Sequence, residues 1–543
     1  MGTEADYESI RKEFKWEVPE DYNFVLDDFE RWAEDRGKIA LITVSDDGKS
    51  AQKHTFWELQ ILSNKFANIL KKKGIKKGDR VFLMLPRCPQ WYIAALGMIK
   101  AGVIMMPTPT LSTGHDIDYR INRAEAIMAV TDGSGTEKVD AVKDKIPGLK
   151  HRIAIGDKID GWESWDELMD EADRDFNVED FGGKTSSSDP MLIYFTSGTT
   201  GNPKMVRHLQ TYAIGHTVTA KYAQGLGPGD LIWVIADTGW AKTAWGKLFG
   251  QWIVGATVMQ WAMTSRFNPE TVANVIQNFG VSVFCAPPTA YRMMISHLNL
   301  KDYDWSYLKH SMSAGEPLNP EVIKVWSEAT GLKIYDYYGQ TETVALVANM
   351  KSFPIKAGSM GKPTPGHDVR IIDDDGNELT DGEEGHIGVR VKPEHPPGVF
   401  HGYWKDEELT KGVFHGDWYY TGDKAYRDED GYFWFVGRAD DVIKASGYRI
   451  GPFEVESALQ EHEAVQESAV IGVPDDMRGQ VVKAYIILAP NYEGTDELKK
   501  ELQEHVKNVT APYKYPRLID FVDELPKTIS GKIRRVELRD NEN

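Results

Sequence analysis

The chain has 543 residues, of which 41% are hydrophobic and 27% charged, and its formal net charge is −19. This composition is typical of a globular protein and allows roughly two to four domains. The acidic balance argues against nucleic acid or an anionic membrane surface as the main partner, but it leaves room for a local basic pocket.

The N-terminus and the two cysteines give little sign of targeting, metal or redox chemistry. Cys88 and Cys285 match no metal-binding or CxxC spacing, which predicts reduced thiols in the core. The first residues, MGTEADYESIRKEF, resemble neither a signal nor a transit peptide. No segment offers the about 18 uncharged apolar residues of a membrane span. We therefore expect a cytoplasmic protein without stable membrane insertion, and leave a homo-oligomer open.

Helices and strands alternate in the first half of the chain. Thr55 and Glu58 fit a capping box, and the helical pattern that follows runs to Gly74. A short apolar strand is predicted over residues 80–85, a helix over 90–100 and another strand over 103–106. This βαβ order predicts a mostly parallel sheet covered by helices.

The composition changes after about residue 360. Short strands with Asp-Gly turns, at 371–376, 380–385 and 428–431, predict a β-rich subdomain. From Gly451 onward the pattern predicts a helix over 453–460, strands over 467–472 and 481–488, and a charged helix near 496–507. We expect an α/β protein with a large N-terminal domain, residues 1–438, of parallel βαβ-type sheets packed with helices plus the β-rich subdomain. A small mobile α+β C-terminal domain should occupy residues 439–543.

A glycine-rich loop follows the apolar segment 191–195. It reads YFTSGTTGNPKMVR from Tyr194 to Arg207. Backbone N–H groups in such a loop can converge on an anion, and Lys204 would add a point charge for phosphate. No Walker A pattern and no Rossmann glycine motif is present. From these residues alone, a phosphate loop and a plain flexible loop both remain open.

The string TSGTTGNPK at Thr196–Lys204 resembles the signature of the adenylate-forming (ANL) superfamily, which includes acyl-CoA synthetases, luciferases and peptide-synthetase adenylation domains. Further segments follow in the order of that family: YDYYGQTE at 335–342, YTGD at 420–423, GRADD at 437–441, KASGYRIG at 444–451 and PKTISGK at 526–532. The resemblance covers about residues 25–540. The segments DTGWAK at 237–242, SAGEP at 313–317, YGQTET at 338–343 and YKYPR at 513–517 are most similar to the medium-chain acyl-CoA synthetases.

The resemblance implies an AMP-forming acid–thiol ligase with two half-reactions. A carboxylate attacks the α-phosphate of ATP to give acyl-AMP and pyrophosphate, and CoA then displaces AMP to give acyl-CoA. The implied small molecules are a carboxylic acid, ATP and CoA, with Mg²⁺ as the metal. Three residues match the catalytic positions: Lys532 would bridge the carboxylate and the α-phosphate, Thr341 would contact the α-phosphate, and Glu342 would bind Mg²⁺.

The same resemblance implies the remaining nucleotide contacts. The β- and γ-phosphates would lie in the glycine-rich loop, the adenine beside Gly315–Pro317 and Tyr338, and the ribose on Asp423, with Arg438 nearby. Outside these motifs, Tyr337 and Tyr338 would be interpreted as aromatic core residues, and Asp423 as a turn residue. The full set expected to bind ATP or AMP is Thr196, Ser197, Gly198, Thr199, Thr200, Lys204, Gly315, Glu316, Pro317, Asp336, Tyr337, Tyr338, Gly339, Gln340, Asp423 and Arg438.

The acyl pocket and the CoA site are implied with less support from motifs. Acetate-specific relatives carry tryptophan where this chain has Gly339, so we expect an open pocket and medium-chain, branched or aromatic acids larger than acetate. Its expected walls, each of which could also be plain packing, are Trp240, Trp245, Cys285, Ala286, Pro287 and Gly339. The expected CoA contacts are Ser446, Gly447, Tyr448, Arg449, Arg478, Lys507 and Arg517, and Asp440 is the expected hinge.

Other functions stay open at this point. The chain could be an acetyl- or propionyl-CoA synthetase, or a stand-alone adenylation enzyme with an acceptor other than CoA. A peptide-synthetase domain would be followed by a carrier domain, and we expect none because the sequence ends at Asn543, soon after Lys532. A luciferase would share the adenylation residues. A non-catalytic ligand sensor would be expected to have lost Lys532, Glu342 or the glycine-rich loop.

Overall fold

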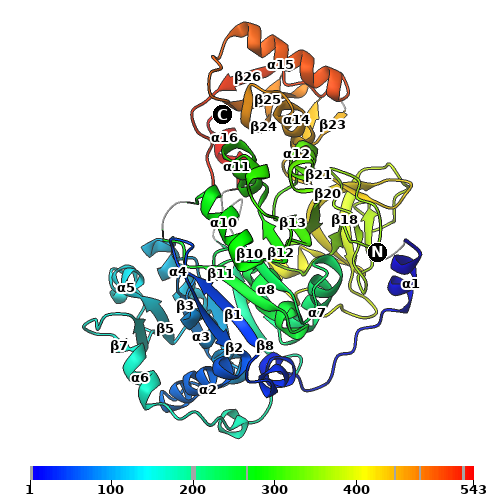
Figure 1. The fold of residues 1–543 in the computed structure, drawn as a ribbon. Helices are drawn as coiled ribbons and strands as arrows, with labels where there is room; N and C mark the ends of the chain where they lie inside the picture. The colour runs from blue at the N-terminus through cyan, green and yellow to red at the C-terminus, as the bar shows by residue number, and fades with distance from the viewer. Residues whose placement is uncertain are drawn as a thin grey trace.

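The structure is a computed structural model that describes residues 4–196, 203–264, 267–445, 448–475, 478–528 and 532–542. The predicted sites Ser197, Gly198, Thr199, Thr200, Ser446 and Gly447 lie outside these residues. Figure 1 shows a large body built from about the first four fifths of the chain and a smaller C-terminal lobe above it.

The helix predicted after Thr55 is confirmed as α2 (Phe56–Lys72). The Thr55 hydroxyl accepts from the Glu58 N–H at 3.1 Å, and the Glu58 carboxylate accepts from the Thr55 N–H at 2.8 Å. This reciprocal pair satisfies two N–H groups that the helix cannot satisfy itself. Lys71 and Lys72 in the last turn suit the negative end of the helix dipole.

Two large sheets form the body, and both are mostly parallel, as predicted. The first has nine strands in the order β16 (Lys362–Pro363), β15 (Val347–Ala348), β14 (Ile334–Tyr338), β13 (His310–Ala314), β12 (Val283–Ala286), β10 (Leu231–Val234), β11 (Thr257–Trp261), β1 (Ile39–Val44), β2 (Ala51–Thr55). The second has seven in the order β7 (Glu163–Ser164), β6 (His151–Ile155), β5 (Met128–Asp132), β3 (Arg80–Met84), β4 (Ile104–Pro107), β8 (Pro190–Phe195), β9 (Met205–Leu209).

The helices of the body connect these strands. They are α3 (Pro89–Lys100), α4 (Gly114–Ala124), α5 (Gly133–Asp140), α6 (Trp165–Glu171), α7 (Thr211–Val218), α8 (Ala241–Lys247), α9 (Phe249–Ile253), α10 (Pro269–Phe279), α11 (Pro288–His297) and α12 (Pro320–Thr330). Every residue of α3 except Gln90 is buried. A helix that is apolar on all sides belongs in a core, and the cluster around it joins Leu41 of one sheet to Val81 and Met191 of the other.

The β-rich subdomain predicted after residue 360 is present as an antiparallel five-stranded sheet. Its strands are β17 (Val369–Ile372), β18 (Gly385–Arg390), β20 (Trp418–Arg427), β19 (Phe414–His415) and β21 (Phe433–Arg438), with α13 (Glu407–Lys411) before β19. The N-terminal helix α1 (Glu4–Glu13) lies against this subdomain (Figure 1), and the Tyr7 hydroxyl donates to the Pro363 carbonyl at 2.9 Å.

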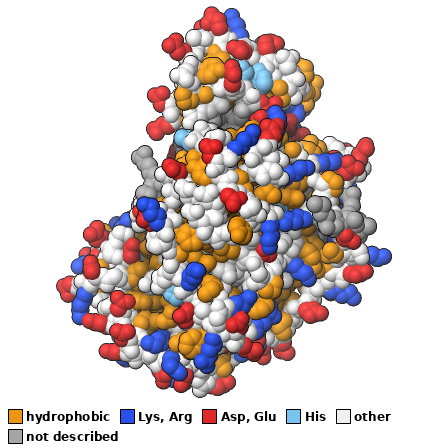
Figure 2. Space-filling view, in the orientation of Figure 1, with side chains coloured by type: hydrophobic (Ala, Val, Ile, Leu, Met, Phe, Trp, Pro, Cys, Tyr) orange, Lys and Arg blue, Asp and Glu red, His pale blue; other side chains and the backbone are white. Residues whose placement is uncertain are grey.

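The C-terminal lobe has its own sheet and core. Its strands are β23 (Tyr448–Ile450), β22 (Ile443–Ala445), β25 (Gly479–Leu488), β24 (Val465–Asp475) and β26 (Leu518–Phe521), and its helices are α14 (Pro452–Gln460), α15 (Asp496–Val509) and α16 (Arg535–Asp540). Figure 2 shows the lobe joined to the body through a narrower waist, with charges of both signs spread over this face. At the waist the Asn319 amide donates to the Ser457 carbonyl at 3.4 Å.

A buried histidine in the body makes stability depend on pH. His367 is 3% exposed, its Nδ1 lies 2.9 Å from the Thr364 hydroxyl, and burial lowers its pKa to about 3. The unfolded chain, with an imidazole pKa of about 6.5, binds more protons between pH 6.5 and 3, so this contribution to stability is lost as the pH falls through that window.

We expect His367→Phe to weaken the acid dependence of the unfolding free energy by about 1.4 kcal/mol per pH unit in that window. Urea unfolding at a series of pH values measures the slope. The exposed His415, changed in the same way, is the matched control. A variant at position 367 with the wild-type slope would contradict this assignment.

Candidate active site

Four neighbouring parallel strands bring the predicted motifs to one edge of the nine-stranded sheet. Strands β10, β12, β13 and β14 are paired in parallel in that order. Their carboxyl ends lead into Asp237–Lys242, Pro287, Gly315–Pro317 and Gly339–Glu342. Ligands of open α/β sheets bind at this edge. Segments more than 100 residues apart in sequence therefore share one site.

Asp423 is the centre of a hydrogen-bond network. It lies 5% exposed on β20 and opposite Arg438 of β21 in the strand register. Its Oδ2 accepts from the Tyr338 hydroxyl at 2.6 Å and from the Gln340 amide at 2.7 Å, and Arg438 Nε lies 3.5 Å from its Oδ1. Burial raises the pKa of Asp423, and Arg438 opposes the rise. The predicted ribose and adenine residues are thus in direct contact.

Glu342 is the buried carboxylate of the site, at 9% exposed. The Tyr403 hydroxyl donates to its Oε1 at 3.0 Å, and Lys204 Nζ lies 5.5 Å from the centre of the Tyr403 ring. Burial raises the pKa of Glu342, while the Tyr403 hydrogen bond and the charge of Lys204 oppose the rise. Tyr403 therefore links the predicted metal ligand to the predicted phosphate lysine, and the sequence analysis had assigned it no role.

The backbone of Thr341 is held by a histidine that the sequence analysis also missed. His208 lies on β9, directly after the glycine-rich loop, and its Nε2 donates to the Thr341 carbonyl at 2.7 Å. Its ring stacks on Tyr212 at 3.7 Å, and burial lowers the pKa of His208 to about 3. The imidazole is therefore neutral and acts as a fixed hydrogen-bond donor.

Lys532 faces this network from the C-terminal lobe. Its side chain is exposed, and it is close enough to oppose the raised pKa of Asp423 and to help lower the pKa of Lys242. An ion cluster supports the segment that follows: Arg535 of α16 lies 2.7 Å from Glu456 and 3.9 Å from Asp441. Arg438 also lies 3.8 Å from the predicted hinge residue Asp440.

A part-buried lysine, Lys242 on α8, lies at the same edge and was given no role from sequence. Its ammonium donates to the Ala314 carbonyl at 2.9 Å, and burial lowers its pKa while Glu316 and Asp336 oppose this. Burial raises the pKa of Asp336, which is 7% exposed. Cys285 Sγ lies 3.4 Å from the Tyr337 hydroxyl. The contact between Tyr337 and Cys285 joins the segment expected to bind adenine to a residue of the predicted acyl wall.

The open space expected beside Gly339 is absent, so that prediction is wrong for this structure. A Cβ built on Gly339 would lie 2.2 Å from the Trp245 indole and 2.4 Å from the Val344 carbonyl. Trp245 is 5% exposed and stacks on Tyr337 at 5.7 Å. A tryptophan from a different helix therefore fills the space that the missing side chain leaves, which only the folded chain reveals.

Several predicted CoA residues make contacts with groups outside the Asp423 network. Arg449, beside the exposed Tyr448, affects the pKa values of Lys424 and Glu384 in the β-rich subdomain. Lys507 and Arg517 flank the Tyr515 ring at 4.2 and 4.9 Å. Arg478 lies 3.9 Å from Asp475. The structure therefore turns Lys532, and not Arg449, toward the nucleotide residues.

The arrangement suits a reaction between two anions. Lys204, Arg438 and Lys532 supply positive charge around two buried carboxylates, Asp423 and Glu342. Preorganised cations and donors of this kind stabilise charge that develops in a transition state. Within the described residues, no group of three or more His, Cys, Asp and Glu is arranged to hold a metal by itself.

Comparison with known proteins agrees with this geometry. The family model of the AMP-binding enzyme matches residues 29–404, and that of the AMP-binding enzyme C-terminal domain matches residues 454–532. The mitochondrial acyl-coenzyme A synthetases ACSM3 and ACSM4 of Mus musculus are both 44% identical, over 99% of this chain and 93% of theirs. A crystal structure of the anthranilate CoA ligase AuaEII with anthranoyl-AMP has a TM-score of 0.89 at 31% identity, covering 97% of this chain and 98% of that one.

These relatives overturn the expected compartment. The ACSM relatives are named as mitochondrial, so the expectation of a cytoplasmic protein is wrong. It depended on a polar N-terminus, which is weak evidence for a compartment. Among the described residues, no helix has the length and apolar character needed to cross a bilayer.

The family match spans more than half of the chain, and the ACSM relatives align over nearly all of it. The observed architecture agrees with these matches: it has both large sheets, the β-rich subdomain and the small C-terminal lobe. The chain therefore belongs to the AMP-binding enzyme family, among the medium-chain acyl-CoA synthetases of the adenylate-forming superfamily.

Proposed function

We propose that this protein is an ATP-dependent acyl-CoA synthetase that activates medium-chain, branched or aromatic acids larger than acetate. The acid and ATP form acyl-AMP and pyrophosphate, and CoA then takes the acyl group and releases AMP. The ACSM relatives are acyl-coenzyme A synthetases by name, and the anthranilate ligase binds an aromatic acyl-AMP. They do not favour an acetyl- or propionyl-CoA synthetase or an acceptor other than CoA.

The observation that carries this proposal is the convergence of Lys532 on the Asp423 network. Asp423, Tyr338 and Gln340 would hold the ribose and adenine side of ATP, and Lys204 the leaving pyrophosphate. Lys532 would then meet the α-phosphate and the attacking carboxylate, and reduce their repulsion. The hinge near Asp440, a boundary after residue 438 and the CoA contacts remain parts of the proposal.

The donors present fit a magnesium ion that arrives with ATP. Mg²⁺ uses one or two carboxylates together with phosphate oxygens and waters. Glu342 offers one buried carboxylate, whose Oε1 accepts from the Tyr403 hydroxyl. Glu342 would hold the ion, which supplies charge neutralisation at the phosphates. Tyr403 would fix the orientation of that carboxylate.

The acyl group would lie along Trp245. The Trp245 carbonyl accepts from Gln224 at 3.0 Å and from Gln251 at 2.8 Å, so the backbone is fixed. The indole N–H has no hydrogen-bond partner among the described residues. The indole ring would turn aside, and an acid larger than acetate would use the space beside Gly339 that the ring fills in this structure.

A panel of acids tests the function and the role of Trp245 together. We expect ATP- and CoA-dependent acyl-CoA formation with butyrate to octanoate and with benzoate, well above that with acetate. Trp245→Ala should raise kcat/KM for octanoate relative to butyrate by about tenfold or more, because each buried methylene contributes about 0.8 kcal/mol. Trp57→Ala, on the distant helix α2, is the control. Activity confined to acetate would contradict the proposal.

A further inference from the structure

Two polar side chains of α7 lie in the core close to Trp245. Tyr212 and His216 are four residues apart and therefore lie on one helix face. Tyr212 is 1% exposed and His216 is 0% exposed. Their ring centres are 4.4 Å apart, and those of His216 and Trp245 are 6.3 Å apart. The three rings form one group, called here the α7 cluster.

The polar atoms of the α7 cluster lack protein partners. Within the described part of the chain, no hydrogen bond reaches the Tyr212 hydroxyl, either ring nitrogen of His216 or the indole nitrogen of Trp245. A buried polar atom left in this state costs about 1–3 kcal/mol. Native proteins satisfy nearly all such atoms, so four together in one place require an explanation.

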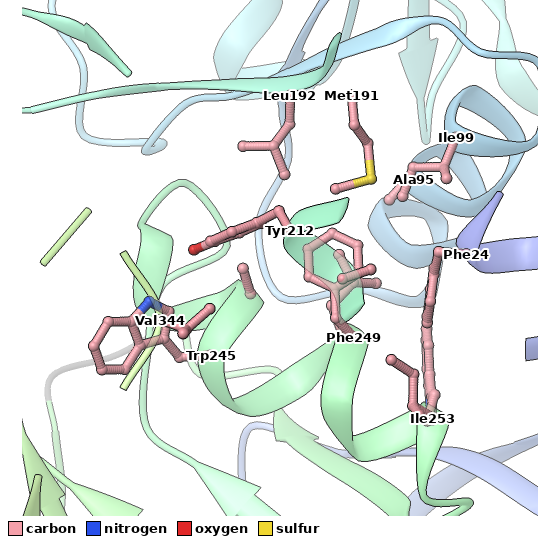
Figure 3. Close-up of a cluster of buried hydrophobic side chains, with 14 of the residues drawn as sticks. Phe24, Ala95, Ile99, Met191, Leu192, Tyr212, Trp245, Phe249, Ile253 and Val344 are labelled. Carbon is pink, nitrogen blue, oxygen red and sulfur yellow. The ribbon is translucent and has the colours of Figure 1, made fainter. Parts of the chain in front are cut away.

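The position of the α7 cluster connects it to the acyl site. Trp245 contacts both regions, since a Cβ on Gly339 would lie 2.2 Å from its indole and the His216 ring centre lies 6.3 Å from its own. Figure 3 shows the Tyr212 hydroxyl directed to the side on which the Trp245 indole lies, with Val344 also nearby. The indole nitrogen of Trp245 opposes the rise in the pKa of Tyr212, so it lies close to the Tyr212 hydroxyl.

The protonation states define what the cluster can bind. Burial lowers the pKa of His216, so its ring is neutral, with one nitrogen that donates and one that accepts. Burial raises the pKa of Tyr212, so its hydroxyl keeps its proton. A second charged group would have no counter-ion in the cluster, whereas a hydroxyl can both donate and accept there.

We propose that Tyr212 and His216 form a subsite for a hydroxyl group that the acid carries at a distance from its carboxylate. The substrate class is then hydroxy-substituted medium-chain carboxylic acids, and this inference rests on the proposed acyl-CoA synthetase function. The carboxylate reacts at the nucleotide edge, the chain passes Trp245, and the distal hydroxyl satisfies the buried atoms of α7.

The test compares ω-hydroxy acids from 4-hydroxybutyrate to 8-hydroxyoctanoate, each with the alkanoate that is one carbon longer. The two members of a pair have the same number of non-hydrogen atoms. We expect kcat/KM for the hydroxy acid to exceed that of its partner by about tenfold or more at one chain length, because the alkanoate leaves the polar atoms unpaired.

Two variants and a control locate the recognition. Tyr212→Phe and His216→Phe should each reduce the hydroxy-to-alkanoate ratio at that chain length by about tenfold. Tyr212→Phe retains the ring that stacks on His208. Tyr92→Phe, on α3, removes another buried hydroxyl without a partner among the described residues and should leave the ratio unchanged.

The outcomes separate this inference from the function on which it rests. Activation of the alkanoates with no preference for a hydroxy acid at any length would overturn the subsite and leave the synthetase function intact. A hydroxyl preference that survives in both α7 variants would also overturn it. Activation of no acid larger than acetate would overturn both.

Discussion

Replacing Lys532 by alanine should abolish acyl-adenylate formation, with a fall of about a hundredfold or more, but spare acyl-CoA formation from supplied acyl-adenylate and CoA. The reason is electrostatic. Lys532 is exposed, lies close enough to affect Asp423, and would neutralise two anions only while they react. The second half-reaction joins a thiol to an acyl-adenylate and has no need of that charge.

Pyrophosphate release measures the first step, and thioester formation from synthetic acyl-adenylate measures the second. Lys527→Ala is the matched control, because Lys527 belongs to the same motif but is paired with Glu467 at 2.7 Å. We expect this control to retain both steps. Equal losses of the two half-reactions in Lys532→Ala would contradict the assignment of this lysine to adenylation.

The second large effect is expected at Asp423. Asp423→Asn retains the size of the side chain but removes the charge that faces Arg438 and that accepts from Tyr338 and Gln340. Hydrogen bonds to a charged group contribute about 1.5–3 kcal/mol each. If the carboxylate accepts both ribose hydroxyls, KM for ATP should rise by about a hundredfold or more.

Initial rates over a range of ATP concentrations, at a saturating concentration of the acid, measure this change. Asp428→Asn is the control, since Asp428 follows β20 but is paired with Lys356 at 2.6 Å and lies outside the proposed site. An unchanged KM for ATP in Asp423→Asn would show that Asp423 has a structural role and does not contact the nucleotide.

The sequence analysis placed the candidate site residues at or near strand ends, because these residues lie in short, continuous motifs. Thr341 and Glu342 follow β14 directly, and Asp423 and Arg438 lie within strands whose turns are marked by Gly and Asp. The capping box at Thr55 depends on residues three apart, and it formed as predicted. The resemblance of these short motifs to those of the adenylate-forming superfamily therefore located the residues expected to bind ATP.

Residues that act through long-range packing could not be found in this way. Tyr403 reaches Glu342 from 61 positions away, and His208 reaches Thr341 from 133 positions away. The signal available for His208 was its place directly after the glycine-rich loop. Trp245 was expected in the acyl wall, but its contact with Gly339 depends on how α8 packs against β14. Glycine at position 339, where acetate-specific relatives carry tryptophan, therefore did not by itself predict an open pocket.

Transfer of heavy oxygen tests the central claim of an acyl-adenylate most directly. With a medium-chain acid labelled with ¹⁸O in its carboxylate, ATP and CoA, the carboxylate oxygen that attacks the α-phosphate stays on phosphorus when CoA takes the acyl group. The account predicts AMP that carries one ¹⁸O atom, as measured by mass spectrometry. Acyl-CoA formed together with unlabelled AMP, or with ADP, would contradict it.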